Sequence, residues 1–299
     1  MDANHEIETM DANHEITLSA GTIRYRDSGA ASGSGDSGAP PVVFVHGLLA
    51  NGLLWRKVAP LLEGTNRVIV PDWPLGSHTT PMHPDADLSP RGVAHLIAEF
   101  LEALELTDAV VVGNDTGGAI CQVLVTERPQ RVGRLVLTNC DAFEHFPPAA
   151  FKPMVVAARA PGGVKAMLAP MRVRKMRQSP MAYGSLTHDP IPDEVTDAYV
   201  APALDNASIR RDAAKLLRGM RPEVTLAAAE RFPTFTKPVL VAWGTDDKFF
   251  ALDEGRRLAT LFPNGRFEEI RGSRTFVSED RPERLAALIR DFVREPVAA

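Results

Sequence analysis

The sequence predicts an α/β protein with a doubly wound, mostly parallel sheet, and two observations support this fold class. Short apolar runs rich in β-branched residues recur along the chain, as in strands that are covered on both faces. Helix-length segments lie between most of these runs, and alternating strands and helices are typical of a doubly wound sheet. The strands are expected at residues 15–18, 22–27, 42–45, 67–70, 109–112, 134–138, 239–243 and 267–270.

Two of the helices have boundaries that can be read from the sequence. Ser89 is a suitable N-cap, with Pro90 at the first helical position, and apolar residues then recur at helical spacing as far as Leu104. A second helix is expected over residues 117–128, because Pro129 cannot continue it.

The domain organisation follows from where the strand pattern is interrupted. Between about residues 143 and 233 the alternation of strands and helices disappears and the spacing of apolar residues becomes helical. This segment is expected to form a helical lid, or cap domain, inserted into the sheet. The α/β core domain is then expected at residues 15–142 and 234–299.

The first residues contain a duplication, because the seven residues that start at Met10 repeat those that start at Met1. Residues 1–14 are therefore interpreted as an N-terminal extension with a duplicated start, outside the fold. A Gly/Ser-rich stretch at residues 28–41 predicts a flexible loop after the first two strands.

The composition limits the binding partners and the cellular compartment that can be expected. The 299 residues carry a net charge of −5, so no basic surface for nucleic acid or an anionic membrane is indicated, and the expected partner is a small-molecule substrate. The two cysteines, Cys121 and Cys140, fit a reducing compartment. Since neither a signal-like N-terminus nor a bilayer-length apolar run occurs, we expect a cytoplasmic protein without membrane contact. A homodimer is left open.

The strongest motif follows the strand expected at residues 109–112. That strand runs into the residues GNDTG at 113–117 and then into a helix, which is the pattern of a nucleophile elbow. Small residues on both sides permit a strained, tight turn, and Asp115 is expected at the N-terminal end of the helix, where the helix dipole favours its ionised form. A simple helix cap is the alternative role for Asp115, but it leaves the strand and the glycines unexplained.

A second motif follows the strand at residues 42–45. The residues HGLL at 46–49 resemble the oxyanion turn of the α/β-hydrolase superfamily, and PDWPLG at 71–76 is similar to another loop of that superfamily. With the elbow, these motifs extend the resemblance over nearly the whole chain and imply the α/β-hydrolase fold. The resemblance also implies that the backbone N–H groups of Leu48 and Thr116 form an oxyanion hole, which stabilises developing negative charge.

Most members of this superfamily carry a serine at the elbow, whereas this chain carries Asp115. An aspartate there resembles the epoxide hydrolases and haloalkane dehalogenases, in which the carboxylate attacks carbon and forms an ester with the enzyme. A histidine, oriented by an acid, then activates the water that hydrolyses this ester. The resemblance places the acid at Asp247, at the end of the GTDD pattern of residues 244–247, with Asp141 as the alternative seat.

The histidine that this chemistry requires is missing from its usual loop. Thr275 occupies that position, and no histidine follows His188. A threonine hydroxyl is not a base near neutral pH, and general-base help contributes about 10²–10⁴-fold in rate, so hydrolysis of an aspartyl ester should be crippled. His46, His145 and His188 are candidate substitute bases, with a structural or surface role as the alternative for each.

The proton donor and the leaving group distinguish the two aspartate-type families. Dehalogenases hold the halide with side chains at positions that read Thr116 and Leu48 here, which disfavours dehalogenation. Epoxide hydrolases use lid tyrosines to protonate the ring oxygen, and Tyr183 and Tyr199 fall in the predicted lid. The alternative for each tyrosine is a purely structural role as a packed aromatic residue.

The sequence therefore predicts an epoxide-hydrolase-like enzyme that uses Asp115 as its nucleophile. No metal-ligand spacing or dinucleotide motif is present, so neither a metal nor a cofactor is expected. Two alternatives stay open. One is a non-hydrolytic lyase or cyclase in which Asp115 is an acid or a base, and the other is a ligand-binding protein that has lost hydrolysis.

Overall fold

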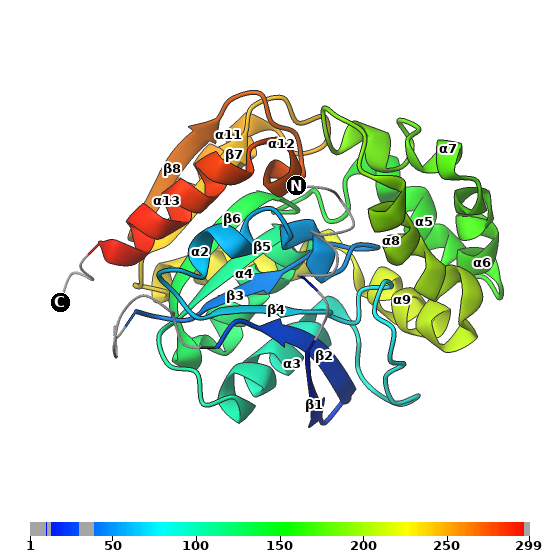
Figure 1. The fold of residues 1–299 in the computed structure, drawn as a ribbon, viewed down its shortest axis with the longest axis horizontal. Helices are drawn as coiled ribbons and strands as arrows, with labels where there is room; N and C mark the ends of the chain where they lie inside the picture. The colour runs from blue at the N-terminus through cyan, green and yellow to red at the C-terminus, as the bar shows by residue number, and fades with distance from the viewer. Residues whose placement is uncertain (1–9, 11–12, 30–38, 296–299) are drawn as a thin grey trace.

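The computed structural model describes residue 10, residues 13–29 and residues 39–295. In this part of the chain an eight-stranded sheet, in the order β1-β2-β4-β3-β5-β6-β7-β8, forms the centre of the molecule (Figure 1). β2 pairs antiparallel with β1 and β4, and the pairs from β4 to β8 are parallel. The strands are β1 (His14–Leu18), β2 (Gly21–Asp27), β3 (Val42–Val45), β4 (Val68–Pro71), β5 (Ala109–Asp115), β6 (Val132–Cys140), β7 (Val239–Gly244) and β8 (Gly265–Ile270).

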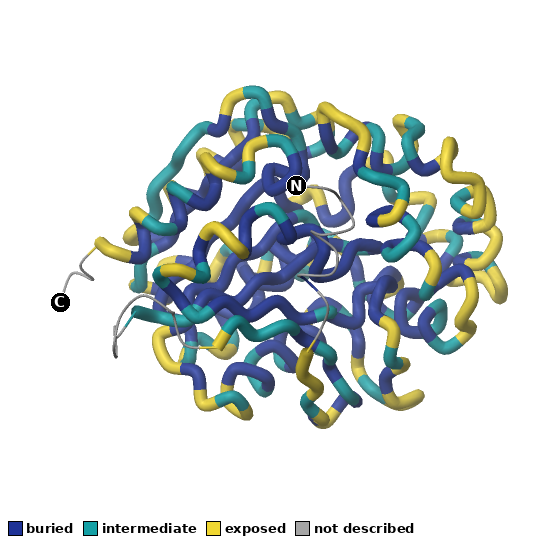
Figure 2. Tube along the Cα trace, in the orientation of Figure 1, coloured by how far each residue is buried: buried dark blue, intermediate teal, exposed yellow. Residues whose placement is uncertain are grey.

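Neighbouring residues of the central strands point to opposite faces of the sheet and enter two separate apolar cores. Val42 and Phe44 of β3 enter the first core, whereas Val43 and Val45 enter the second. A strand covered on both faces needs apolar residues at consecutive positions, which is why a run such as VVFV forms a strand here. Figure 2 shows these central strands as buried along their length.

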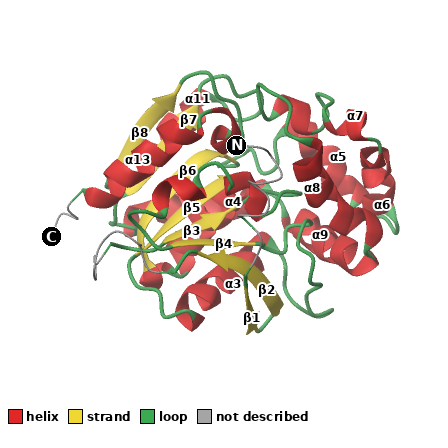
Figure 3. Cartoon of the chain, in the orientation of Figure 1, coloured by secondary structure: helices red, strands yellow, loops and turns green. Residues whose placement is uncertain are grey.

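Helices cover both faces of the sheet (Figure 3). Apolar residues of two helices enter the first core, and those of three others mainly enter the second. The first two are α2 (Ala59–Leu62) and α13 (Pro282–Arg294), and the other three are α3 (Pro90–Ala103), α4 (Thr116–Glu127) and α11 (Leu252–Leu261). The short α12 (Val277–Asp280) directly precedes α13.

The predicted fold class is confirmed, and every strand expected from the sequence is present with small shifts at its ends. β6 is longer than predicted and includes residues 132–133 and 139–140. Arg134 near its start is buried, and its guanidinium donates to the backbone carbonyl of Glu295 at 2.6 Å. α3 begins as expected, with Pro90 as its first residue and the Ser89 hydroxyl accepting the N–H of Gly92 at 3.1 Å.

Between β6 and β7, in a stretch that is described throughout, the chain forms helices and no strand of the sheet. Figure 1 shows α5 to α9 gathered at one side of the sheet, whereas α10 packs against α4 and contributes to the second core. The predicted boundaries of lid and core stay a prediction. The α-helices of this stretch are α5 (Lys152–Ala157), α6 (Gly163–Leu168), α7 (Arg174–Arg177), α8 (Asp193–Asp205), α9 (Ala207–Gly219) and α10 (Pro222–Arg231).

The fold starts within the predicted N-terminal extension. β1 begins at His14, and the side chain of Asn13 accepts the N–H of Asp27 at 3.0 Å, so both residues belong to the sheet edge. Met10 is buried in the first core. The rest of the duplicated start, and most of the Gly/Ser-rich loop expected at residues 28–41, lie outside the described residues.

None of the helices in the described ranges combines the length and the apolar content that a bilayer-spanning segment needs. The expected cytoplasmic location stays a prediction.

Candidate active site

The turn between β5 and α4 holds Asp115 in an unusual backbone conformation. Its φ of 52° and ψ of −133° lie in a region that residues other than glycine rarely adopt, and such strain persists only where the surroundings enforce it. Gly117 is required here, because a Cβ at that position would collide with the backbone carbonyl of His46. The elbow predicted at residues 113–117 is therefore pressed against the turn that follows β3.

The backbone N–H groups of Leu48 and Thr116 lie near the carboxylate of Asp115 and lower its pKa, although no hydrogen bond of good geometry joins them to it. On the same side the carboxylate lies directly against Gly47, where a Cβ would collide with Oδ2. These are the two donors that the resemblance assigned to an oxyanion hole. An ester carbonyl formed from Asp115 would stay within reach of the same donors.

The charge state of Asp115 is balanced near neutral pH. Burial has the largest effect and raises its pKa, the negative charge of Asp247 raises it further, and the result is a pKa of about 7. The residue as a whole is nevertheless partly exposed. Near pH 7 both the nucleophilic carboxylate and the protonated acid are present in comparable amounts.

Asp247, the predicted acid, lies in the loop after β7 and accepts hydrogen bonds on both oxygens. Oδ1 accepts from the N–H groups of Phe249 and Phe250 at 2.8 and 3.1 Å, and Oδ2 accepts from the side-chain amide of Asn139 at 2.7 Å. Burial raises its pKa, while these hydrogen bonds and the Thr275 hydroxyl lower it. Asp247 acts on Asp115 through its charge.

Asp141, the alternative acid, is buried just beyond the end of β6. Its Oδ2 faces the hydroxyl of Thr116 at 3.4 Å, and its Oδ1 has no hydrogen-bond partner among the described residues. Burial raises the pKa of Asp141 well above its ordinary value, and the charge of Asp115 adds to this effect. Both candidate acids thus lie close enough to Asp115 to interact with its charge.

Thr275 is fully buried beside Asp247. Its hydroxyl lowers the pKa of Asp247, although no hydrogen bond of good geometry joins the two groups and Thr275 Oγ1 has no such partner among the described residues. The backbone carbonyl of Thr275 accepts the side-chain amide of Asn114 at 2.7 Å. The residue before Asp115 is therefore tied to the residue that occupies the expected histidine position.

The loop that carries Thr275 is also hydrogen-bonded to the predicted lid. The guanidinium of Arg274 donates to the backbone carbonyl of Thr187 at 2.6 Å, and the N–H of Phe276 donates to the carbonyl of Leu186 at 2.9 Å. These contacts hold residues 184–188 against the core beside the site.

His46 does not have the free ring nitrogen that a substitute base needs. Its Nδ1 lies 2.9 Å from the carbonyl of Gly47 and donates to it, so Nε2 is the acceptor for the N–H of Trp73 at 2.9 Å. Burial is the main cause that lowers its pKa, to about 4. His46 is thus a neutral structural residue that joins two loops, and its candidacy as a base is corrected.

The other two histidine candidates pair with carboxylates at the surface. His145 is paired with Glu254, and His188 Nε2 lies 3.0 Å from Asp246. The side chains of both histidines are exposed, at 56% for His145 and 38% for His188. The structure therefore does not bring either of these predicted substitutes to the elbow.

The two candidate tyrosines differ in how they are placed relative to Asp115. Tyr183 is buried, donates its hydroxyl to the carbonyl of Leu49 at 2.6 Å, and is near enough to Asp115 for the charge of the carboxylate to raise its pKa. The ring of Tyr199 lies next to that of Tyr183, with ring centroids 5.6 Å apart. Burial is the main cause that raises the pKa of Tyr199, and the charges that act on it most are those of Glu279 and Arg56. Of the two, Tyr183 is brought toward Asp115 and Tyr199 is not.

Two polar residues of the site were missed by sequence reasoning. Asn139 binds both Asp247 and the backbone of Gly244, whose N–H it accepts at 2.6 Å. Asn114 donates its amide to the Thr138 hydroxyl at 2.9 Å as well as to Thr275. In the sequence, the position of Asn114 directly before Asp115 is the signal that could have indicated these hydrogen bonds.

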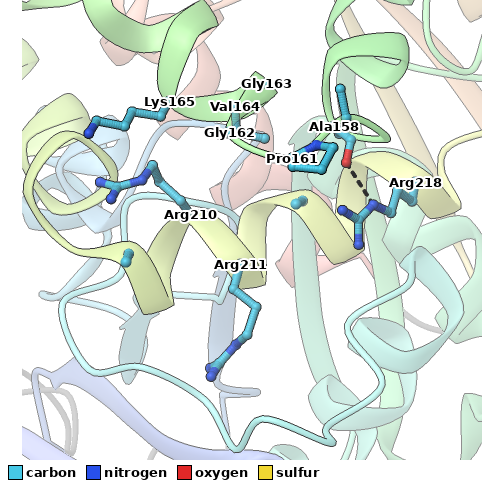
Figure 4. Close-up of a pocket in the computed structure, with 12 residues that line it drawn as sticks. Ala158, Pro161, Gly162, Gly163, Val164, Lys165, Arg210, Arg211 and Arg218 are labelled. Atoms are coloured by element: carbon cyan, nitrogen blue, oxygen red, sulfur yellow. Dashed lines mark hydrogen bonds between the residues drawn. The ribbon is translucent and has the colours of Figure 1, made fainter.

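A pocket of about 260 Å³ lies elsewhere, within the predicted lid (Figure 4). It is lined by Lys165, Arg210, Arg211 and Arg218, and the Arg218 guanidinium donates to the carbonyl of Ala158 at 2.7 Å. None of the candidate site residues lines this pocket. No group of three or more His, Cys, Asp or Glu side chains in the described ranges is placed to hold a metal ion.

Comparisons with known proteins identify the family of the chain. A model of the α/β hydrolase fold family matches residues 40–282. A haloalkane dehalogenase of Mycobacterium bovis is 28% identical over 276 residues, which cover 91% of this chain and 91% of the relative.

Solved structures share the fold over almost the whole chain. An α/β hydrolase fold protein from Burkholderia ambifaria superposes with a TM-score of 0.77 at 25% identity, covering 95% of this chain and 98% of its own. A ligand-free epoxide hydrolase superposes with a TM-score of 0.74 at 20% identity, covering 93% of this chain and 97% of its own. The chain is therefore an α/β hydrolase: it belongs to the α/β hydrolase fold family.

Proposed function

We propose that this protein is an epoxide-hydrolase-like enzyme in which the carboxylate of Asp115 attacks a carbon atom of a small organic electrophile. The observation that supports this most directly is the strained backbone of Asp115 at the elbow, where its carboxylate lies against Gly47 and near the backbone N–H groups of Leu48 and Thr116. These surroundings limit the direction of the carboxylate, which is what a nucleophile that must meet carbon in line requires.

The first step forms one bond and breaks another. A carboxylate oxygen of Asp115 bonds to an epoxide carbon, the carbon–oxygen bond of the ring breaks, and the ring oxygen leaves with the electron pair and takes up a proton. The hydroxyl of Tyr183 is the candidate donor, once it releases the carbonyl of Leu49. The product of this step is a hydroxyalkyl ester of Asp115.

The second step, hydrolysis of the ester, lacks a general base in this chain. Hydrolysis of the ester needs a water molecule deprotonated as it attacks the ester carbonyl, whose oxygen would be stabilised by the N–H groups of Leu48 and Thr116. Thr275 offers no base for this step, and the histidines described above are engaged elsewhere. The ester is therefore expected to form and then to persist.

Intact-mass spectrometry tests the proposal. The protein is incubated with a panel of small epoxides and haloalkanes, in parallel with Asp115→Asn. We expect one added epoxide mass on the wild-type chain and none on the variant, with little diol released. A panel that gives neither an adduct nor turnover would contradict the proposal.

A second candidate function is favoured by the balanced charge of Asp115. A carboxyl group whose pKa lies at about 7 is suited to exchange protons with a substrate at neutral pH. In this alternative Asp115 acts as acid or base in a lyase or cyclase reaction, without forming an ester. Turnover without any mass adduct, and without incorporation of oxygen from ¹⁸O-labelled water, would support it.

A further inference from the structure

The pocket of about 260 Å³ in the predicted lid lies between two elements, and we call it the lid groove (Figure 4). One wall is a single face of α9, because the lining residues of this helix recur every three or four positions and point the same way. The other wall is residue 158 with residues 160–165, from the end of α5 to the first turn of α6. The lining residues of α9 are Ala207, Arg210, Arg211, Ala214 and Arg218.

Basic side chains lie at both ends of the lid groove. Arg210 and Arg218 are about 12 Å apart along α9, since the helix rises about 1.5 Å per residue, and the small Ala214 lies between them. Figure 4 shows Lys165, from the facing wall, reaching toward the same end as Arg210. The groove therefore has two cations at one end, one cation at the other end, and apolar atoms between them.

Three of these positive charges are not balanced by acidic groups. In the part of the chain that the structure describes, no acidic residue lines the groove, and Lys165, Arg210 and Arg218 form no ion pair. Arg211 differs, because its guanidinium points away from residues 161–165 in Figure 4 and donates to the carboxylate of Asp212 at 2.7 Å. The lid groove thus has an excess positive charge of three.

Two of the three cations are already held in place by the backbone. Arg210 Nη1 donates to the carbonyls of Ala203 and Leu204 at 2.8 and 3.0 Å, and Arg218 Nε donates to the carbonyl of Ala158 at 2.7 Å. The remaining N–H groups of both guanidinium groups have no hydrogen-bond partner among the described residues. A side chain that is fixed in advance loses less conformational freedom when it binds a ligand.

The size and the charge of the groove limit what it can hold. Its volume lies just below the roughly 300–1,000 Å³ that is typical of ligand pockets, so the ligand must be small. A carboxylate matches the fork of N–H donors on a guanidinium group. A carboxylate at each end of a ligand stays within the three available positive charges, whereas two phosphate groups, at about −1.5 to −2 each, would exceed them.

We propose that the lid groove binds an elongated organic dianion, a linear dicarboxylate with one end between Lys165 and Arg210 and the other end at Arg218. The apolar middle of the ligand lies along Ala214. This site is separate from the proposed nucleophile, because none of the candidate active-site residues lines the groove. A ligand bound there connects α9 with residues 158–165 across the lid.

An NMR titration of the ¹⁵N-labelled protein at low ionic strength tests the proposal with suberate, monomethyl suberate and succinate. Monomethyl suberate keeps the length of suberate but has one carboxylate, and succinate is too short to span about 12 Å. We expect suberate to bind about fivefold more tightly than either, the upper range for an additional exposed ion pair. The shifts should lie at residues 158–165 and 207–218, and added salt should weaken binding.

Three variants, each checked for a dispersed ¹H–¹⁵N spectrum, localise the effect. Arg218→Gln should abolish the preference for suberate over monomethyl suberate, and Lys165→Gln should weaken the binding of both. Lys175→Gln removes an exposed lysine of α7 outside the groove and should change nothing. Equal affinities for suberate and monomethyl suberate, or a preference for suberate that Arg218→Gln leaves intact, would overturn the proposal.

Discussion

At the scale of single residues, Asp115 combines backbone strain with an unfavourable charge environment. Its positive φ and its buried carboxyl group both cost stability, yet the backbone N–H groups of Leu48 and Thr116 lie near the carboxylate and lower its pKa. Residues that are costly and over-determined in this way cluster at functional sites. The energetic cost itself is measurable.

Asp115→Asn should change how stability depends on pH. The native pKa of about 7 lies above the ordinary value of 3.8, so the folded state binds the proton more tightly, and stability falls as pH rises between these two values. The wild type should lose roughly 2–3 kcal/mol relative to the variant between pH 5 and pH 8. Urea unfolding at both pH values measures the difference, and parallel profiles would refute the assignment.

Thr275→His should shorten the lifetime of the aspartyl ester. A histidine at this position would lie beside Asp247, which can orient the ring, and general-base catalysis should speed release of the ester by about 10²–10⁴-fold. The decay of the adduct mass with time measures this rate. Thr275→Val, which keeps the shape of threonine but lacks its hydroxyl, should leave the lifetime unchanged, and a similar acceleration in both variants would argue against a base.

At the scale of elements, the segment from the end of β8 through α12 joins the site to its surroundings. The loop that carries Thr275 binds residues 184–188 of the predicted lid through Arg274 and Phe276. The next turn supplies Glu279, whose carboxylate pairs with the buried guanidinium of Arg56 beyond the oxyanion turn. One short segment thus positions both the lid and the loop after β3.

Arg274→Ala should loosen the lid without unfolding the core. The variant loses the 2.6 Å hydrogen bond to Thr187, while the backbone bond from Phe276 to Leu186 remains. Amide hydrogen exchange at residues 184–188 should become faster, because local opening there costs less free energy. Exchange in β5 and β6 should be unchanged, and the exposed Arg271→Ala is the matched control. Unaltered amide hydrogen exchange at residues 184–188 would mean that the Arg274 side chain does not stabilise this part of the lid.

Glu279→Ala should destabilise the whole fold. The carboxylate of Glu279 pairs with two basic side chains. Nη2 of the buried Arg56 lies 2.8 Å from Oε2, and Nζ of Lys57 lies 3.0 Å from the same oxygen. Removing one member of a buried ion pair typically costs about 3–5 kcal/mol. Urea unfolding at neutral pH tests this, with Glu283→Ala of α13 as an exposed control. A loss below about 1 kcal/mol, the range of surface ion pairs, would show that the pair is not effectively buried.

At the scale of the whole molecule, the fold was predictable because its signals are local. Each central strand is covered on both faces, so its run of apolar residues is visible in the sequence, as in Val42–Val45. The elbow was predictable for a similar reason, since a tight turn around Asp115 demands small residues on both sides.

The composition of the site was less predictable because it depends on contacts between distant segments. Nothing near Tyr183 or Tyr199 in the sequence indicates that only the first approaches Asp115, since this depends on how the lid packs. The partners of His145 and His188, on α11 and after β7, are likewise far away in the chain. Charge coupling between Asp115 and Asp141 arises only when β5 and β6 pair.

A carboxylate oxygen of Asp115 is proposed to bond to carbon, and localisation of the adduct tests this directly. The protein is treated with a reactive epoxide, digested, and sequenced by tandem mass spectrometry. The added mass is predicted on Asp115 and nowhere else at low reagent concentration, and it should be absent from Asp115→Asn. An adduct on Cys121, Cys140 or a surface side chain with Asp115 unmodified would contradict the claim.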